Sequence, residues 1–297
     1  MTPDLRHNPL NGTPVLIVPG RGSRPGATGR TTRVGEARTC PFCEGHERET
    51  PPEVDVDAAE GREHDTPGWK VRVVPNKYPA IPGHEVVIHG PEHLTALADA
   101  PTRLVEEVVR MWSRRREVHR RTGDAYLLAG LNEGAGAGAS LEHSHSQLVP
   151  FTEVPSAVTA EAPALAQPCV LCAELRRLAD CVIRREDGLV TFAAPWARSP
   201  YETWIAPERH IGLVDEDAAA LGRALLDAAR RYRSLLGAGL SWNAILHDAP
   251  LGGGDWHWHL ETLPRITVPA LVELGSGLWI NTVDPATAAA ELGSATT

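Results

Sequence analysis

Two histidines one residue apart, His143 and His145, follow a run of small residues in the stretch 138–147, GASLEHSHSQ. Imidazole serves proteins as a metal ligand, as a general base and as a nucleophile. In a strand, residues i and i+2 face the same side. The two side chains can therefore project together, one toward a metal ion and one toward a substrate, and the stretch alone leaves their roles open.

Four of the five cysteines form two Cys-x-x-Cys pairs. In a cytosolic chain such pairs are more often metal sites or redox motifs than disulfides. Each supplies two ligands of a tetrahedral zinc site, which histidines elsewhere can complete. The predicted sets are Cys40, Cys43, His93 and His143, and Cys169, Cys172, His210 and His257. The alternative is free thiols beside ordinary surface histidines, and Cys181 is interpreted as a buried apolar thiol.

The residues around His145 suit attack on a phosphate. Small residues from Gly134 to Ser140 let backbone N–H groups approach an anion. His145 would attack phosphorus, and Gln147, on the same side of the strand, would donate to an oxygen as charge develops. The later stretch 257–261, HWHLE, has Glu261 in the place of Gln147, and an ionised carboxylate there would repel a phosphoryl oxygen. We therefore expect one catalytic half and one architectural half.

The same landmarks occur twice along the chain, which is typical of an internal repeat. Each half has a Cys-x-x-Cys pair, two strand-like runs, a histidine after the second run, a helical stretch and a His-x-His. The offset is 129 residues from Cys40 to Cys169, 117 from His93 to His210, and 114 between the His-x-His pairs. Loop shortening between matched elements produces such a steady decrease.

The elements that must carry these residues follow from hydrophobic patterning. Strands are predicted at 71–74, 84–88, 126–131, 189–193, 201–205 and 242–246, and helices at 101–119 and 215–236. Each half is therefore an α+β unit with an antiparallel sheet and a helix. The proline- and alanine-rich segment 151–168 is predicted to connect residues 1–150 to residues 169–297.

Composition excludes several classes of protein. The 297 residues carry a formal net charge of −9, which argues against general binding of nucleic acid. No targeting segment or membrane-spanning run is visible, so a cytoplasmic location without membrane association is expected. Residues 1–40 are rich in arginine, including Arg21 and Arg24, which suits a small anionic ligand.

The chain resembles the galactose-1-phosphate uridylyltransferase branch of the histidine triad superfamily. The shared stretches are RHNPLNGTPVLIVPGRGSRP, CPFC, VVPNKYPA, GPEH, LNEGAGAGASLEHSHSQ and HWHLETLPR. The usual family motif is His-Pro-His-Gly-Gln, whereas residues 143–147 read His-Ser-His-Ser-Gln. That version, with the second Cys-x-x-Cys, is closer to the members similar to ADP-glucose phosphorylase. The resemblance implies two tandem histidine-triad-like halves related by duplication, and two zinc ions per chain.

Site roles follow position by position from the resemblance. It implies that His145 forms a covalent nucleotidyl-histidine, with Gln147 and Ser140 on the phosphates. The implied substrate-binding residues are Arg21, Arg24, Asn76, Lys77, Asn132, Gly138, Gly275, Ser276 and Gly277. Some members bind a second metal through a glutamate and three histidines, where Glu161, His247, His257 and His259 stand. Because Cys169, Cys172 and His210 are present, the zinc set with His257 is preferred.

The implied activity is transfer of a nucleoside monophosphate between a nucleoside diphosphate hexose and a hexose 1-phosphate, by a homodimer. The segment 271–285, LVELGSGLWINTVDP, lacks the lysine and glutamine that contact the hexose phosphate in the galactose enzymes. Phosphorolysis of a nucleoside diphosphate sugar by inorganic phosphate is therefore an alternative. A dinucleotide hydrolase or phosphorylase, and a zinc-stabilised nucleotide-binding protein without turnover, are the others.

Overall fold

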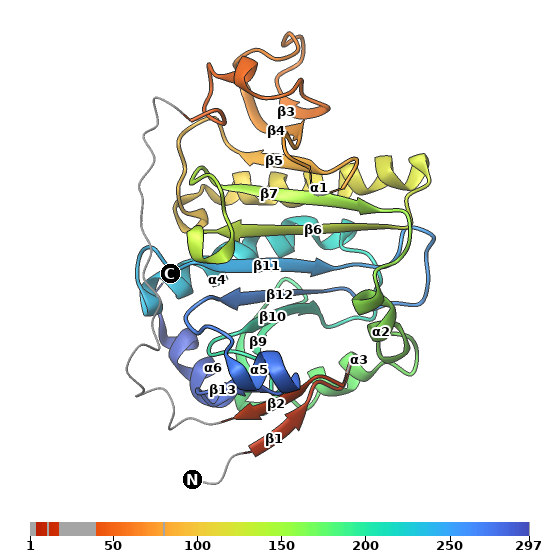
Figure 1. Ribbon diagram of the computed structural model, residues 1–297, viewed down its shortest axis with the longest axis vertical. Coiled ribbons are helices and arrows are strands. Elements are labelled where there is room, and N and C mark those ends of the chain that lie inside the picture. The colour runs from red at the N-terminus through yellow and green to blue at the C-terminus, as the bar shows by residue number, and fades with distance from the viewer. Residues whose placement is uncertain (1–3, 11, 18–39, 80, 297) are drawn as a thin grey trace.

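The computed structural model describes residues 4–10, 12–17, 40–79 and 81–296. One ten-stranded antiparallel sheet forms its centre, in the order β3-β4-β5-β7-β6-β11-β12-β10-β9-β8 (Figure 1). Its strands are β3 Asp55–Ala58, β4 Trp69–Pro75, β5 Glu85–His89, β6 Tyr126–Glu133, β7 His145–Phe151, β8 Val182–Glu186, β9 Leu189–Ala193, β10 Thr203–Pro207, β11 Trp242–His247 and β12 His259–Pro264. All six predicted strands are confirmed, with ends that differ by at most two residues.

The strand order is a mirror image about the central pair of β6 and β11. The expected α+β class is thus confirmed, but the expectation of a separate sheet in each half is wrong. Unpaired sheet edges are a liability, and joining the halves at β6 and β11 removes two of them. At this junction Gly130 faces the neighbouring strand so closely that a Cβ would lie 2.5 Å from the carbonyl oxygen of Ala244.

Two long helices, α1 (Thr102–Thr122) and α4 (Ala218–Leu236), cover one face of the sheet (Figure 1). α1 ends at Gly123, whose φ of 92° is the left-handed conformation that stops a helix. Its buried stripe includes Val105, Val108 and Trp112. Both helices were predicted, and the three residues before α4 form a 3-10 turn, Asp215–Asp217.

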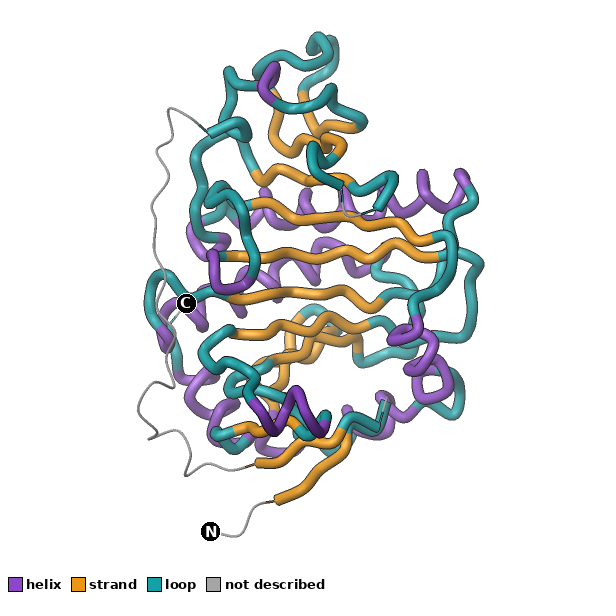
Figure 2. Tube along the Cα trace, viewed as in Figure 1, coloured by secondary structure: helices purple, strands orange, loops and turns teal. Residues whose placement is uncertain are grey.

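Among the described residues, no layer of long helices covers the other face of the sheet, as the helix and strand colours of Figure 2 show. Here Cys40, Phe42, Trp69, Val86 and Ile88 form a small second core against β4 and β5. The main core lies between the sheet and the two helices. We call the sheet face that carries the second core the open face.

Smaller elements complete the chain. A three-stranded sheet of β1 (Asp4–His7), β2 (Pro14–Ile17) and β13 (Trp279–Asn281) lies near α5 (Leu271–Ser276) and α6 (Pro285–Ser294). The predicted connector contains α2 (Ser156–Leu165), and α3 (Val170–Leu175) carries the second cysteine pair. The short 3-10 turns are Glu47–Glu49, Leu97–Asp99, Ala135–Ala137 and Ala179–Cys181. Among the described residues, no helix is both long and apolar enough to cross a membrane.

Candidate active site and metal centres

The start of β7 fixes the hydrogen positions on both histidines of the His-x-His pair. Nε2 of His143 lies 3.0 Å from the carbonyl oxygen of Gly90, and Nδ1 of His145 lies 2.8 Å from the carbonyl oxygen of His143. A carbonyl oxygen only accepts, so each of these nitrogens carries its proton. His143 therefore presents the lone pair of Nδ1, and His145 presents that of Nε2.

The first cysteine pair meets His143 and His93 at the edge of the second core. Nδ1 of His143 lies 3.7 Å from Sγ of Cys40 and 3.6 Å from Sγ of Cys43, and Nδ1 of His93 lies 3.3 Å from Sγ of Cys43. Zinc bonds of about 2.3 Å to sulfur and 2.0 Å to nitrogen at a tetrahedral angle place the two ligand atoms about 3.5 Å apart. The four side chains therefore fit a zinc ion, and the lone pair of His143 points at it.

Protonation chemistry agrees with this fit. Burial, together with the neighbouring Cys40, raises the pKa of the Cys43 thiol to about 12, so this thiol is uncharged until a cation displaces its proton. Burial lowers the pKa of His143 to about 4, which keeps the imidazole in its neutral, metal-binding form.

The second cysteine pair repeats this arrangement. Nδ1 of His257 lies 3.5 Å from Sγ of Cys169 and 3.2 Å from Sγ of Cys172, while Nδ1 of His210 lies 3.6 Å from Sγ of Cys172. Nε2 of His257 donates to the carbonyl oxygen of Pro207, as its counterpart donates to Gly90. The structure thus brings together both predicted groups of four ligands.

His145 is buried, with 5% of its surface exposed, and faces the second core. The ring of Phe42, which lies between the two cysteines of the first pair, meets it edge-on at a centroid distance of 5.3 Å. Burial lowers the pKa of His145, so the ring is neutral near pH 7 and Nε2 keeps its lone pair. A neutral imidazole of fixed tautomer is the form that a nitrogen nucleophile requires.

Gln147 follows on the same face of β7. Its Oε1 lies 2.9 Å from Nε2 of His84, in the loop between β4 and β5, and the same nitrogen lies 3.3 Å from Nδ2 of Asn76. With Oε1 engaged by His84, the NH₂ group of Gln147 is the part left for a substrate. Asn76 also accepts a hydrogen bond from the backbone N–H of Tyr78 (2.8 Å), and Lys77 is exposed.

The loop of small residues lies beside the junction of the two halves. Nδ2 of Asn243 donates to Oδ1 of Asn132 at 2.6 Å and to the carbonyl oxygen of Ala137 at 2.9 Å. Asn132 thereby keeps its NH₂ group for another acceptor. Gly138 has a φ of 88°, and Ser140 is exposed at the end of the loop.

Other predicted substrate residues are not brought to this place. Arg21 and Arg24 lie outside the described residues. Gly275, Ser276 and Gly277 form the C-terminal end of α5, where Ser276 Oγ donates to the carbonyl oxygen of Val272 at 2.5 Å. A helix C-terminus presents carbonyl groups, which disfavours an anion. α5 packs beside β13.

The second His-x-His differs because its outer histidine is enclosed. The ring of His259 stacks between Trp204 and His247, each with a centroid distance of 4.6 Å. Glu261, in the place of Gln147, pairs with Arg198, which also pairs with the buried Glu202. The expected repulsive carboxylate is therefore neutralised, and packing, more than charge, closes this half to a substrate.

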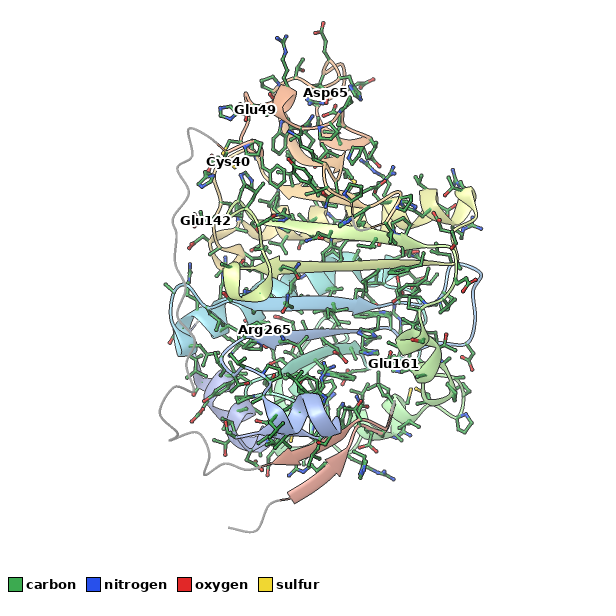
Figure 3. All side chains as sticks on the ribbon, viewed as in Figure 1. Cys40, Glu49, Asp65, Glu142, Glu161 and Arg265 are labelled. Carbon is green, nitrogen blue, oxygen red and sulfur yellow. The ribbon has the colours of Figure 1, made fainter. Side chains whose placement is uncertain are left out.

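A third group of potential ligands consists of Glu161, His247, His259 and Glu261. Oε2 of Glu161 accepts from Nδ1 of His247 at 2.9 Å. His257 belongs instead with the cysteines, as the distances above show. Glu161 lies near the opposite end of the strands from Cys40 and Glu142 (Figure 3).

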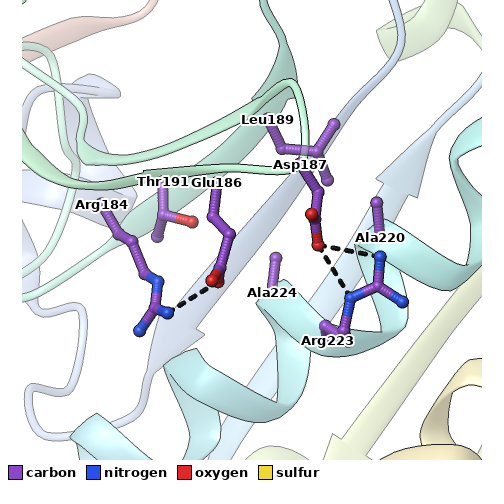
Figure 4. A pocket seen from close by; sticks show the side chains of 8 residues that line it. All are labelled: Arg184, Glu186, Asp187, Leu189, Thr191, Ala220, Arg223 and Ala224. Carbon is purple, nitrogen blue, oxygen red and sulfur yellow. Dashed lines mark hydrogen bonds and ion pairs between the residues drawn. The ribbon is translucent and has the colours of Figure 1, made fainter.

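A small surface pocket lies elsewhere, between β8, β9 and α4 (Figure 4). Ion pairs of Arg184 with Glu186 and of Arg223 with Asp187 occupy its polar groups. A cavity of about 10 Å³ holds at most one water molecule, so this pocket is not a substrate site.

The sequence analysis missed two residues of the site, His84, which contacts Gln147, and Phe42, which contacts His145. His84 is a lone histidine beyond any repeat, and its partner Gln147 is 63 residues away. Phe42 could have been predicted from the sequence. It lies between the two cysteines of the first pair, so the residues that fix those cysteines also fix its ring.

Comparisons with known proteins show which sequences the chain resembles. Residues 79–155 match the family model described as galactose-1-phosphate uridyl transferase, N-terminal domain. ADP-glucose phosphorylase of Arabidopsis thaliana is 28% identical, over 96% of this chain and 90% of that protein. Galactose-1-phosphate uridylyltransferase of Thermotoga maritima is 27% identical, over 97% of each chain.

Solved structures extend the match to the fold. The crystal structure of the Arabidopsis ADP-glucose phosphorylase with bound ADP-glucose covers 100% of both chains at 27% identity and a TM-score of 0.85. A uridylyltransferase structure, 24% identical with a TM-score of 0.72, covers 99% of this chain and 98% of its own, and shares the fold.

Fold and similarity together define a histidine triad superfamily enzyme of the nucleotidyltransferase or phosphorylase type. Within that class, the chain is similar over nearly its whole length to members of the galactose-1-phosphate uridylyltransferase family, as the sequence resemblance predicted.

Proposed function

We propose that the protein transfers a nucleoside monophosphate from a nucleoside diphosphate hexose to a hexose 1-phosphate in two steps. Nε2 of His145 attacks the α-phosphorus, the bond to the bridging oxygen breaks, and the sugar 1-phosphate leaves with that oxygen. A phosphate oxygen of the second sugar 1-phosphate then attacks the nucleotidyl-histidine, and His145 recovers its lone pair. The observation that carries this proposal is the hydrogen bond that fixes the proton of His145 on Nδ1.

The neighbouring groups supply electrostatic support. The NH₂ group of Gln147 donates to a non-bridging oxygen in both steps, and backbone N–H groups of residues 134–140 together with Ser140 hold the phosphates. Asn76, Lys77, Asn132 and Gly138 line the nucleotide side. Arg21 and Arg24 would add positive charge, and Gly275, Ser276 and Gly277 would act from the second chain of a homodimer.

The two Cys2His2 groups would hold one zinc ion each. With every position filled by protein, such an ion would be structural and would supply a cross-link rather than an activated water. In the first half, Cys40, Cys43, His93 and His143 would thereby tie Phe42 to the start of β7. In the second half, Cys169, Cys172, His210 and His257 would tie α3 to the strand pair β10 and β12.

Trapping the covalent intermediate tests this function. Incubation with UDP-glucose or ADP-glucose should add one nucleoside monophosphate to His145, detected by mass spectrometry, and release the sugar 1-phosphate. The adduct should be absent from His145→Ala, whereas Lys70→Ala, a change of an exposed side chain of β4, should keep it. An undiminished adduct in His145→Ala would refute the assignment.

Inorganic phosphate is the second candidate acceptor. The similarity to an ADP-glucose phosphorylase solved with ADP-glucose favours it. In that case the products from a nucleoside diphosphate sugar are the nucleoside diphosphate and the sugar 1-phosphate. Turnover measured with phosphate, with a sugar 1-phosphate and with neither separates phosphorylase, transferase and hydrolase, and an adduct that never transfers indicates a binding protein.

We infer that the mirrored strand order reflects an internal duplication. The N-terminal half, 1–150, would be catalytic, the segment 151–168 would connect, and the C-terminal half, 169–297, would be architectural. A cytoplasmic location and a homodimer remain predictions, which fractionation and light scattering check.

A further inference from the structure

The two serines of the His-Ser-His-Ser-Gln motif face away from the substrate, into the main core. Ser144 and Ser146 are 4% and 0% exposed, and both contact His89, which is 1% exposed. Nδ1 of His89 lies 2.9 Å from Oγ of Ser144, and Nε2 lies 3.0 Å from Oγ of Ser146. Nε1 of Trp112, on α1, donates to Oγ of Ser146 at 2.8 Å.

These four side chains form a linear chain of hydrogen bonds, in the order Trp112, Ser146, His89 and Ser144, which links α1, β7 and β5. Burial lowers the pKa of His89 well below its ordinary value, so the ring is neutral and has one donor and one acceptor nitrogen. Each serine hydroxyl can complement either nitrogen. Each polar side-chain atom of the chain thus has at least one hydrogen-bond partner in a dry interior, where such networks are most rigid.

The backbone of Ser144 is held as firmly as its side chain. Its N–H donates to the carbonyl oxygen of Leu94 at 2.6 Å, and its carbonyl oxygen accepts from the N–H of His89 at 3.1 Å. In a planar trans peptide, the N–H of Ser144 and the C=O of His143 point in opposite directions. Holding Ser144 therefore aims the His143 carbonyl, which is the acceptor for Nδ1 of His145.

We propose that the Trp112–Ser146–His89–Ser144 chain is a positioning device that keeps the reactive tautomer of His145. It acts through the His143–Ser144 peptide and touches no substrate, and its catalytic consequence rests on the proposed function. Proline in the middle of the motif has no N–H to offer. With serine at 144, three hydrogen bonds take the place of the rigid proline ring. They join Ser144 to the carbonyl oxygen of Leu94, to the backbone N–H of His89 and to the ring of His89.

The second half provides a matched control. Tyr232 of α4 hydrogen bonds to Thr262 of β12 at 2.6 Å, again from a long helix to the buried face of a strand. Thr262→Val removes a buried hydrogen bond of the same kind without touching β7. It should lower stability as Ser144→Ala and Ser146→Ala do, and leave the chemistry at His145 unchanged.

The test compares Ser144→Ala, Ser146→Ala and Thr262→Val with the wild type, as full-length zinc-loaded proteins well below their melting temperatures. Imidazole ¹⁵N spectra should show a single Nδ1-protonated tautomer of His145 in the wild type and Thr262→Val, and mixed tautomers in the serine variants. The rate of nucleotidyl-His145 formation per folded molecule should fall about tenfold or more in the serine variants, because small misplacements are costly.

One tautomer and unchanged adduct rates in both serine variants would overturn the proposal. Equal rate losses in Thr262→Val would do so as well, since they would show a general effect of stability. If the wild type forms no adduct at all, the proposed function fails, while the ¹⁵N spectra still decide the role of the chain.

Discussion

At the scale of single residues, one hydrogen bond decides which nitrogen of His145 keeps its lone pair. The carbonyl oxygen of His143 accepts from Nδ1 of His145, so Nε2 has a free lone pair, as the proposed nucleophile requires. Burial keeps that ring neutral. The two histidines differ in which ring nitrogen has the lone pair. The carbonyl oxygen of Gly90 accepts from Nε2 of His143, and that of His143 accepts from Nδ1 of His145.

Gln147→Glu tests the neutral donor beside His145. The change copies the residue of the second half, but Glu261 there has Arg198 as its partner, whereas Gln147 has His84. Loss of one such donor usually lowers kcat by about 10² to 10³, and we expect Gln147→Glu to lower it further because it also places an uncompensated negative charge at the phosphates. Steady-state kinetics measure it, and Gln147→Ala should fall less. A Gln147→Glu enzyme with wild-type kcat would contradict this role.

Residues that act in pairs across the sheet were the hardest to predict. The metal ligands were found because Cys-x-x-Cys spacing repeats, and the structure brings together both groups of four. His84 and His89 carry no spacing signal, since their partners are set by the register of β5 on β7. The serines at 144 and 146 were noted only as a departure from a motif, because a sequence does not show which side of the strand is buried.

At the scale of elements, the predicted strands are those with apolar or alternating runs that lie inside the sheet. The edge strands β3 and β8 were missed because Asp55–Ala58 and Val182–Glu186 are short and charged, as exposed edges tend to be. The helix α2 was interpreted as a connector because its prolines, including Pro163 inside the helix, are typical of loops.

The two metal centres support different elements, and their loss should differ accordingly. We expect two zinc ions per chain in the wild type and one in either Cys43→Ser or Cys172→Ser, measured by elemental analysis. Cys43→Ser releases Phe42 from His145, so its rate of adduct formation should fall about 10 to 100-fold. Cys172→Ser should lower the melting temperature and slow the adduct much less.

Two results would speak against this assignment. A wild-type protein without zinc after purification free of chelators would remove both sites. Equal rates of adduct formation in the two variants would show that the first centre has no special link to β7.

At the scale of the whole molecule, one sheet and one pair of helices make the halves inseparable. The helices α1 and α4 cross so closely at Gly222 that a Cβ there would lie 2.7 Å from Cα of Glu106 and 2.8 Å from its backbone nitrogen. Backbone atoms cannot turn aside as a flexible side chain does. This crossing therefore sets how the two halves lie against each other.

Gly222→Ala should destabilise the protein as a whole. Overpacking of this kind costs about 1 to 3 kcal/mol, more than the roughly 1 kcal/mol gained by alanine in a helix. Chemical denaturation should give one transition, shifted to lower denaturant. Gly293→Ala in α6, where the nearest atom is 3.9 Å away, is the control and should be neutral or stabilising. A Gly222→Ala protein of unchanged stability would refute the tight crossing.

The enclosed His259 limits how this enzyme can change. Glu261→Gln alone would complete a His-x-His-x-Gln sequence in the second half, yet the imidazole would stay between Trp204 and His247. It would also take from Arg198 one of its two carboxylate partners. A second active centre is therefore several simultaneous substitutions away. Under the proposed function, the N-terminal half would carry the chemistry and the C-terminal half would serve as its scaffold.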